Sequence, residues 1–339
     1  MPDPMTSHRI PMDGRDVRAQ LAALRSDYPA LYRCIDLGKA EKWAVEVAGN
    51  ARRRDDFAAE EAGGRGGHYV TAQAMNVEAR ATGVAELFRL IRSGPPRRRI
   101  VVDMLGGDGL VSRVCSRLGL SDVDIITCDG SPYMVAAAWA GGRPALLQAA
   151  QRPLFRDGSV DAVLLAYGTH HIDRGLRAET VGNAHRILGA DGVLVVHDFA
   201  VGGPVDIWFT DIVDRYSAMG HPYPHFTTDE VDEYLAKAGF STWEVLEIDD
   251  PIIATGETAE RAELNLGAYL VNMYGLVEAQ EAFGEHEATV WAVARAREIF
   301  RYSTAGGEID CCTVDYDLER RAWRARLPRK AIVGVGRKA

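Results

Sequence analysis

Two histidine-containing segments carry the residues of this sequence that are best suited to chemistry. His197 and Asp198 end an apolar run, and His221 and His225 lie in a segment rich in proline and aromatic residues. Imidazole nitrogen and carboxylate oxygen together suit a divalent metal or iron that keeps positions open for a substrate. The same residues suit a metal-free reaction with Asp198 as general base. The sequence leaves both interpretations open, together with a third in which the loop histidines only pack.

A glycine-rich turn forms a second functional segment. The apolar run 99–103 ends in Asp103, and Gly106, Gly107 and Gly109 follow before a segment with helical spacing. Glycines allow a tight turn and the close approach of a ligand, and the next helix directs its free N–H groups to the same place. A dinucleotide fingerprint would read G-x-G-x-x-G. This turn differs, because an acid precedes the glycines and they are more tightly bunched.

Strands and helices alternate after this turn. Runs that read as strands are 99–103, 123–129, 162–167, 193–199, 242–248 and 330–336. This alternation predicts a parallel sheet with crossover helices. Asp129 ends the second strand, 20 residues after Gly109. An acid there accepts hydrogen bonds from ribose hydroxyls, and its distance from the glycine turn favours that role over a simple turn residue.

The order of these segments resembles the class I S-adenosylmethionine (SAM) methyltransferases. The glycine turn resembles their first motif, D/E-x-G-x-G-x-G, with Leu105 in place of the first glycine. The run from Asp129 to Met134 resembles their second motif, and 153–163 resembles their LPF-x-DGSFD-x-V signature. The resemblance implies an α/β, Rossmann-like fold with a seven-stranded, mostly parallel sheet. It also implies an N-terminal helical region and a helical insertion before the last strand.

The resemblance also implies a set of cofactor contacts. SAM would contact Asp103, Gly106, Gly107, Gly109, Asp129, Gly130, Met134, Gln151, Tyr69 and Gln73. Tyr69 and Gln73 would meet the methionine part. The acid that often binds adenine falls at Ala149, so that contact must come from backbone, Gln148 or Gln151. His170 and His171 match the family's HH-I ending of strand four and are candidate catalytic or pocket-lining residues.

The strand end at His197-Asp198, the histidine-rich loop and the insertion resemble the 2-oxo acid C-methyltransferases. These methylate the β-carbon of keto acids such as phenylpyruvate or 2-ketoarginine in secondary metabolism, including antibiotic biosynthesis. The resemblance implies a small-molecule acceptor and a metal held by His197, Asp198 and either His225 or His221. The alternative is a metal-independent O- or N-methyltransferase with Asp198, His197 or His170 as base. A SAM-binding protein that methylates nothing is a third interpretation.

Four regions are expected along the chain. These are an N-terminal helical lid or dimerisation region (1–95), a SAM-binding core (96–250), a helical insertion (251–328) and a final strand (329–339). Gly94, Pro95 and Pro96 mark the first boundary. We expect the segments before Pro95 and between Thr255 and Asp315 to be helical and to cover the acceptor.

Composition narrows the class of partner. The chain has 339 residues, is 47% hydrophobic and carries a formal charge of −9. These values allow one large core with appendages and argue against nucleic acid or an anionic membrane as main partner. No apolar run spans a membrane and no signal peptide is visible. Five cysteines without a C-x-x-C pair fit a reduced cytosol. We therefore expect a cytoplasmic protein and, from the family, a homodimer.

Overall fold

The computed structural model describes residues 13–49, 55–93, 97–304 and 306–339. The expected boundary at Pro95 and Pro96 and the N-terminal segment examined for a signal peptide lie outside the described residues. Within the described part, no helix is both long and apolar enough to cross a membrane.

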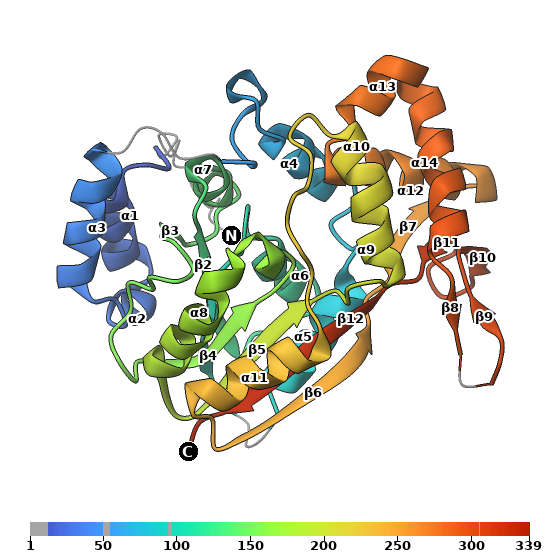
Figure 1. Ribbon diagram of the computed structural model, residues 1–339. Helices are drawn as coiled ribbons and strands as arrows, with labels where there is room; N and C mark the ends of the chain where they lie inside the picture. Colours follow the sequence, from blue (N-terminus) through green and yellow to red (C-terminus); the bar gives the residue numbers. More distant parts are fainter. Residues whose placement is uncertain (1–12, 50–54, 94–96, 305) are drawn as a thin grey trace, which may run out of the picture.

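A seven-stranded sheet forms the centre of the molecule, in the order β3-β2-β1-β4-β5-β12-β6 (Figure 1). Its strands are β1 (Arg99–Asp103), β2 (Val123–Asp129), β3 (Ala145–Leu147), β4 (Val160–Leu165), β5 (Leu188–Asp198), β6 (Thr242–Asp249) and β12 (Lys330–Arg337). Only β12 runs antiparallel to its neighbours in this sheet. The predicted mostly parallel Rossmann-like sheet is therefore confirmed.

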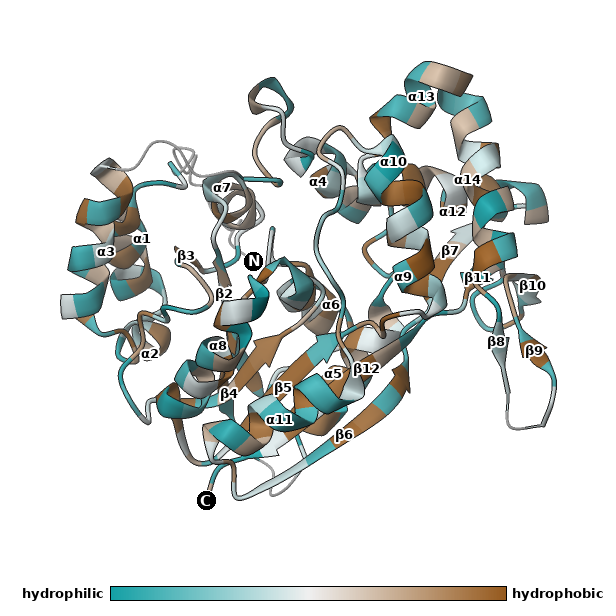
Figure 2. Ribbon diagram, in the orientation of Figure 1, coloured by the Kyte–Doolittle hydropathy of each residue, from teal (hydrophilic) through white to brown (hydrophobic). Residues whose placement is uncertain are grey.

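Helices cover both faces of this sheet because side chains alternate along each strand. Val101 belongs to one buried cluster and Val102 to the other, and Val195 and Val196 divide in the same way. One face packs on α5 (Ala81–Ile91) and α6 (Leu110–Arg117). The other packs on α7 (Pro132–Ala140), α8 (Arg174–Ile187) and α11 (Thr228–Ala238). The central strands are correspondingly apolar in Figure 2.

Three N-terminal helices cover the β3 edge of the sheet: α1 (Val17–Asp27), α2 (Pro29–Tyr32) and α3 (Leu37–Gly49). The Gln20 Oε1 accepts a hydrogen bond from the Leu147 backbone N–H at 2.8 Å. The indole N–H of Trp43 donates to the Leu147 carbonyl at 2.8 Å. An exposed strand edge carries unpaired backbone groups, so these two side chains replace a missing neighbouring strand.

The insertion before the last strand contains the expected helices α12 (Ala259–Tyr274) and α14 (Glu285–Ile299), with α13 (Val277–Phe283) between them. Strands flank these helices: β7 (Ile252–Gly256), β8 (Tyr302–Ser303), β9 (Ile309–Asp310), β10 (Thr313–Asp317) and β11 (Ala322–Leu327). The expectation of helix from Thr255 to Asp315 is therefore wrong at both ends. Charged residues concealed the strands. Arg324 pairs with Asp315 directly across the β10–β11 ladder, and Arg326 pairs with Asp310 on β9 of the two-stranded sheet.

Candidate active site

The glycine turn brings the carboxyl ends of β1 and β2 together. Gly106 donates its N–H to the Cys128 carbonyl at 2.9 Å. A Cβ on Gly106 would lie 2.6 Å from Asp103 Oδ2, so no side chain fits there. Gly107 and Gly109 have φ angles of 55° and 82°, which glycine adopts without strain. Gly109 then begins α6 as its N-cap residue.

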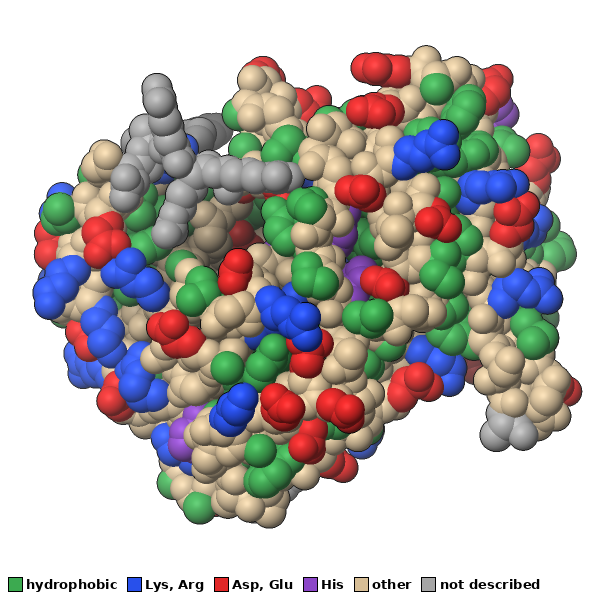
Figure 3. Space-filling view, in the orientation of Figure 1, with side chains coloured by type: hydrophobic (Ala, Val, Ile, Leu, Met, Phe, Trp, Pro, Cys, Tyr) green, Lys and Arg blue, Asp and Glu red, His purple; other side chains and the backbone are tan. Residues whose placement is uncertain are grey.

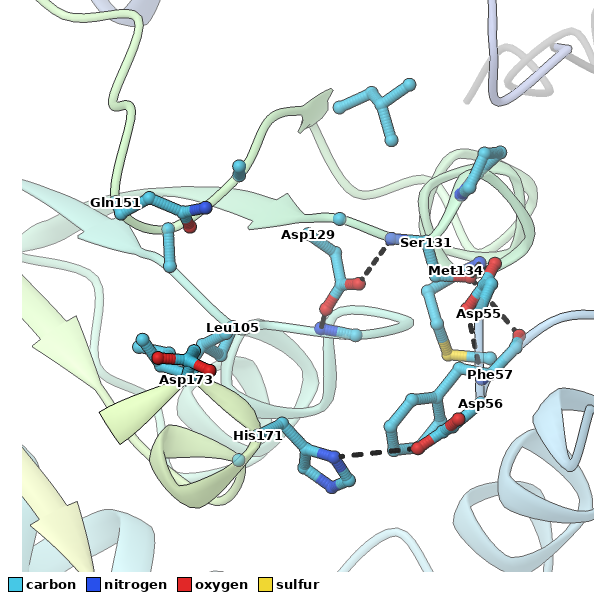
Figure 4. A pocket seen from close by; sticks show the side chains of 18 of the residues that line it. Asp55, Asp56, Phe57, Leu105, Asp129, Ser131, Met134, Gln151, His171 and Asp173 are labelled. Atoms are coloured by element: carbon cyan, nitrogen blue, oxygen red, sulfur yellow. Dashed lines mark hydrogen bonds and ion pairs between the residues drawn. The ribbon is translucent and has the colours of Figure 1, made fainter. Parts of the chain in front are cut away.

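Asp129 is held against this turn at the end of β2. Its Oδ2 accepts the Gly107 N–H at 2.9 Å and its Oδ1 accepts the Ser131 N–H at 2.8 Å (Figure 4). Burial raises the pKa of Asp129 to about 6, and these two hydrogen bonds oppose that rise. At neutral pH the group is therefore a carboxylate with acceptor capacity left for hydroxyl donors.

A cavity of about 470 Å³ opens beside this carboxylate. Six of the predicted SAM contacts line it: Tyr69, Gly107, Asp129, Gly130, Met134 and Gln151. Figure 3 shows the hollow between the α1–α3 lobe and the rest of the molecule. Its volume lies within the usual range for a small-molecule site, roughly 300–1,000 Å³.

Four predicted contacts do not line the cavity: Asp103, Gly106, Gly109 and Gln73. Asp103 lies beneath the turn, where burial raises its pKa to about 8 and neither carboxylate oxygen has a partner among the described residues. Gln148 is also unavailable for adenine, because its Oε1 accepts the Leu154 N–H and its Nε2 faces the Met104 Sδ. Gln151 or the backbone is left for that contact.

The cavity also has lining residues that the sequence analysis missed. Asp55, Asp56 and Phe57 come from the segment before α4 (Gly66–Met75), and Tyr223 comes from the histidine-rich loop. The Tyr223 hydroxyl donates to Asp56 Oδ2, which joins the two segments over one end of the cavity. Nothing in the local sequence of 55–57 distinguishes it from an ordinary loop.

A buried histidine cluster lies beside this end of the cavity. Its ring centroids are 4.7 Å apart for His170 and His225, 5.0 Å for His170 and His221, and 5.8 Å for His221 and His225. The Nε2 atoms of all three are buried and lack a hydrogen-bond partner among the described residues. Buried polar atoms are rarely left unpaired, so three in one place indicate a ligand.

Carboxylates behind two of these rings fix their orientation. Both Asp198 oxygens lie 2.9 Å from His170 Nδ1, and Asp206 Oδ1 lies 2.6 Å from His225 Nδ1. Asp206 belongs to α9 (Pro204–Trp208). Since each Nδ1 is engaged, Nε2 is the nitrogen that remains for a ligand.

Arg177 forms hydrogen bonds to both histidine-containing segments, the turn at 169–172 and the loop at 221–226. Its Nη2 donates to the carbonyls of His170 and Pro224, and its Nε donates to the Ile172 carbonyl. The guanidinium also lies 3.9 Å from the centroid of the Phe226 ring. A single buried side chain on α8 therefore sets the distance between the turn after β4 and the loop before α11.

Two donor sets in the described residues have metal-binding spacing, with all ligand atoms of each set within 4.8 Å of one another: His170, Asp198 and His225, and His170, His171 and His221. Burial, followed by the neighbouring His170, lowers the pKa of His171 well below its usual value and that of His221 to about 2. Neutral imidazoles of this kind are the form that binds metals.

Of the expected ligand set, Asp198 and His225 lie together with His170, but His197 does not join them. Successive strand residues point to opposite faces, so His197 lies away from Asp198. Its Nε2 is 3.6 Å from Asp250 Oδ2, and its Nδ1 is 3.5 Å from the backbone N of Tyr167. His197 therefore supports Tyr167, which lines the cavity with an unusual φ of 61°.

Comparisons with known proteins concern the family of the central domain. Residues 102–196 match the family model of the methyltransferase domain. A search of curated proteins finds no significant match. The matched residues, the strand order and the glycine turn together support a SAM-dependent methyltransferase with SAM as its cofactor.

Similar solved structures include the YcgJ protein of Bacillus subtilis, at 17% identity over 75% of this chain and 98% of that chain, with a TM-score of 0.46. Phosphoethanolamine N-methyltransferase 2 of Haemonchus contortus, solved with S-adenosylhomocysteine, shares 14% identity over 75% of this chain and 53% of its own, with a TM-score of 0.46. A SAM-dependent methyltransferase of Archaeoglobus fulgidus shares 18% identity over 49% and 71%, with a TM-score of 0.40. None of these values identifies an acceptor.

Proposed function

We propose that this methyltransferase transfers the SAM methyl group to the β-carbon of a 2-oxo acid, with the help of a divalent cation or iron. The three buried, unpartnered Nε2 atoms of His170, His221 and His225 carry this proposal. The proposed ligands are these three histidines, so His170 takes the place of the His197 of the sequence-based hypothesis and Asp198 orients His170 instead of binding the metal. Keto acids such as phenylpyruvate or 2-ketoarginine are the proposed acceptors, in secondary metabolism.

The donor chemistry of the cluster fits such a metal. Imidazole nitrogens suit zinc, iron and related ions, and metal-binding histidines commonly donate their second ring N–H to a carboxylate. Asp198 and Asp206 supply that carboxylate for His170 and His225. A metal bound there would act as a Lewis acid that withdraws charge from the keto oxygen and makes the β-carbon more acidic.

His171 is the proposed acceptor of the β-proton. It lines the cavity, and its lowered pKa keeps the imidazole neutral before the reaction. Its Nδ1 lies 3.9 Å from Asp56 Oδ2, and that carboxylate would stabilise the imidazolium (Figure 4). The β-carbon loses its proton to His171 and takes the methyl group, while the sulfur keeps the electron pair of the broken S–CH₃ bond. The products are S-adenosylhomocysteine and the methylated 2-oxo acid.

The remaining side chains position and enclose the reactants. Asp129 is proposed to hold the ribose, with Gly107 and Met134 along the rest of SAM. The contact of Tyr223 with Asp56 closes one end of the cavity, and exclusion of water protects a reactive carbanion. The N-terminal and inserted regions, with the boundaries expected from sequence, are proposed to act together as this cover.

A homodimer is also proposed. Phe283 on α13 and Val290 on α14 are exposed apolar residues, and Phe283 packs on the Trp291 ring at 5.3 Å. Such a surface would suit a second copy of the chain.

The second candidate function is metal-independent O- or N-methylation. The His171–Asp56 pair supports it, because a hydroxyl or amine acceptor needs only a base. Of the bases expected from sequence, Asp198, His197 and His170 are buried and none lines the cavity. His171 would therefore serve in this reaction too.

Metal analysis combined with proton exchange separates the two candidates. We expect purified protein to contain stoichiometric metal and to accelerate deuterium exchange at the β-carbon of phenylpyruvate over the uncatalysed rate, without SAM. His170→Ala should lose both properties, whereas the exposed His286→Ala control should keep them. Full methyl transfer by metal-stripped protein or by His170→Ala would refute the metal-assisted reaction and favour O- or N-methylation.

A further inference from the structure

Arg80 is a buried cation without a matching anion. Its side chain precedes α5, and the residue is only 5% exposed. Its Nη2 donates to the Met273 Sδ at 3.0 Å, and its Nε has no hydrogen-bond partner among the described residues. A thioether is a weak acceptor, and Arg80 forms no ion pair within the described part of the chain. Burial of an unpaired charge is costly, so this arrangement calls for an explanation.

Arg65 approaches the same methionine from the other side. Its Nη1 donates to the Met273 carbonyl at 2.8 Å, and its guanidinium lies 4.2 Å from the centroid of the Phe57 ring. Burial lowers the pKa of Arg65, Asp56 opposes this effect, and Arg80 adds to it. Asp56 is already engaged by the Tyr223 hydroxyl. Two arginines thus repel each other around Met273 with little compensating charge.

The two arginines lie directly behind the wall of the cavity. Arg80 Cζ is 4.7 Å from the centroid of the Tyr167 ring, and both Tyr167 and Phe57 line the cavity. Arg65 also lies close enough to influence His171 and His221 electrostatically. Asp250 feels the charge of Arg80, which helps to lower the pKa of that carboxyl, but Asp250 already binds Arg329 at 2.6 Å. The positive charge therefore faces the histidine end of the cavity, away from the adenine end at Gln151.

We propose that Arg65 and Arg80 form an anion-binding subsite that holds the carboxylate of the methyl acceptor. The reaction itself rests on the proposed function, but the subsite predicts only that the acceptor is an organic anion. A carboxylate placed between the guanidiniums would relieve their repulsion and gain charge-assisted hydrogen bonds. In a 2-oxo acid the keto group is bonded directly to this carboxylate, so the same contact would place the keto oxygen at the histidine end of the cavity.

The subsite is tested by comparing the affinity of the protein for a carboxylic acid with its affinity for the corresponding ester. Phenylpyruvate and its methyl ester differ in one negative charge, and each can be titrated into protein saturated with S-adenosylhomocysteine. Hydrogen bonds to charged groups are worth about 1.5–3 kcal/mol, which is roughly 10- to 150-fold in affinity. We expect the wild type to prefer the acid by that factor. Arg80→Met should lose most of this preference, and Arg80→Lys should keep part of it.

Arg89→Met provides the matched control, because Arg89 lies on α5 itself and pairs with Glu86 on the surface. It should keep the acid preference of the wild type. Equal affinity of the wild type for acid and ester would overturn the subsite. Loss of SAM affinity in Arg80→Met with an unchanged acid preference would also overturn it, since the guanidinium would then serve the methionine carboxylate of SAM.

Binding and turnover report on different proposals. If the acid preference is present and depends on Arg80, the subsite stands even when neither compound is methylated. That result would refute 2-oxo acid methylation and leave another organic anion as acceptor. Methylation of phenylpyruvate without a preference for acid over ester would support 2-oxo acid methylation and refute the arginine subsite.

Discussion

Asp198 accepts two hydrogen bonds from the same residue, one from the backbone N–H of His170 at 2.6 Å and one from its Nδ1 at 2.9 Å. This double contact joins the end of β5 to the turn that follows β4. It also fixes the imidazole ring so that Nε2 points away from the sheet-end carboxylate. The relationship gives Asp198 an orienting role in the proposed metal site.

Substitution of Asp198 by Asn tests that role. The amide keeps the size of the side chain but removes the charge that supports the ring, and such changes commonly cost 10- to 100-fold in metal affinity. We expect Asp198→Asn to bind metal about 10- to 100-fold more weakly in a chelator competition. The exposed Asp157→Asn should bind as the wild type does. Identical metal affinity in both variants would argue against the orienting contact.

Replacement of His197 should have a different effect from replacement of His170. His197 is fully buried beside Asp250 and Tyr167, so His197→Ala leaves a cavity that costs about 2–5 kcal/mol of unfolding free energy. Because it lies outside the histidine cluster, we expect the purified variant to retain its metal. Urea unfolding and metal analysis on one preparation measure both quantities. Loss of metal by folded His197→Ala would restore the sequence-based ligand set.

This difference shows where sequence information ends. The glycine turn and Asp129 were predictable because they lie in consecutive strand–turn units, whose carboxyl ends must meet in a parallel sheet. The sequence-based ligand set joined His197 and Asp198 without taking into account that neighbouring residues of a strand point to opposite faces. The contact of Asp198 with His170, however, depends on the pairing of β4 with β5 and on the short turn at 169–171.

Arg80 illustrates a second limit. Its burial accompanies the packing of α4 against α12, and Met273, which Arg80 contacts, lies 193 residues further along the chain. In the sequence, Arg80 lies between Glu78 and Ala81, and no apolar periodicity there indicates that its side chain is buried. The insertion strands were missed for a related reason, since cross-strand ion pairs allowed charged residues where an apolar alternation was expected.

The proposed ribose contact is tested by Asp129→Ala. Loss of hydrogen bonds to a carboxylate should weaken SAM binding by about 1.5–3 kcal/mol in calorimetry. Asp124→Ala is the matched control, because Asp124 lies on the same strand and pairs with Arg98 on the surface. Unchanged SAM affinity in folded Asp129→Ala would exclude the contact.

The raised pKa of Asp129 predicts a pH effect on the same equilibrium. Its pKa is about 6, since burial disfavours the charged form. Ribose hydroxyls donate best to the carboxylate, so SAM affinity should be constant at higher pH and fall as the pH decreases through about 6. Calorimetric titrations between pH 8 and pH 5 would measure this. Asp129→Asn should flatten that part of the profile, and a persistent decrease in this variant would assign it to another group.

Arg329 and Asp250 form a buried ion pair whose disruption should be severe. The Arg329 Nη2 lies 2.6 Å from Asp250 Oδ2, and its Nε donates to the Asp250 carbonyl at 2.9 Å. Both side chains are almost completely buried, so Arg329→Met leaves the Asp250 carboxylate without its ion-pair partner. Breaking such a pair typically costs about 3–5 kcal/mol. Lys330→Met is the neighbouring control, because its partner Glu247 is exposed and surface pairs contribute about 0–1 kcal/mol.

The decrease in unfolding free energy caused by Arg329→Met should also depend on pH. Burial raises the pKa of Asp250, but Arg329, His197 and Arg80 together more than offset this, so the pKa in the wild type is lowered. The pair therefore stabilises the wild type above the ordinary carboxyl pKa, and this contribution disappears as the pH falls through the lowered value. Without Arg329, its lowering effect is lost, burial weighs more against the charged form, and the carboxyl takes up a proton at a higher pH than in the wild type. Urea unfolding should therefore show a larger difference between wild type and variant at pH 8 than at pH 5, and a difference independent of pH would contradict the charged pair.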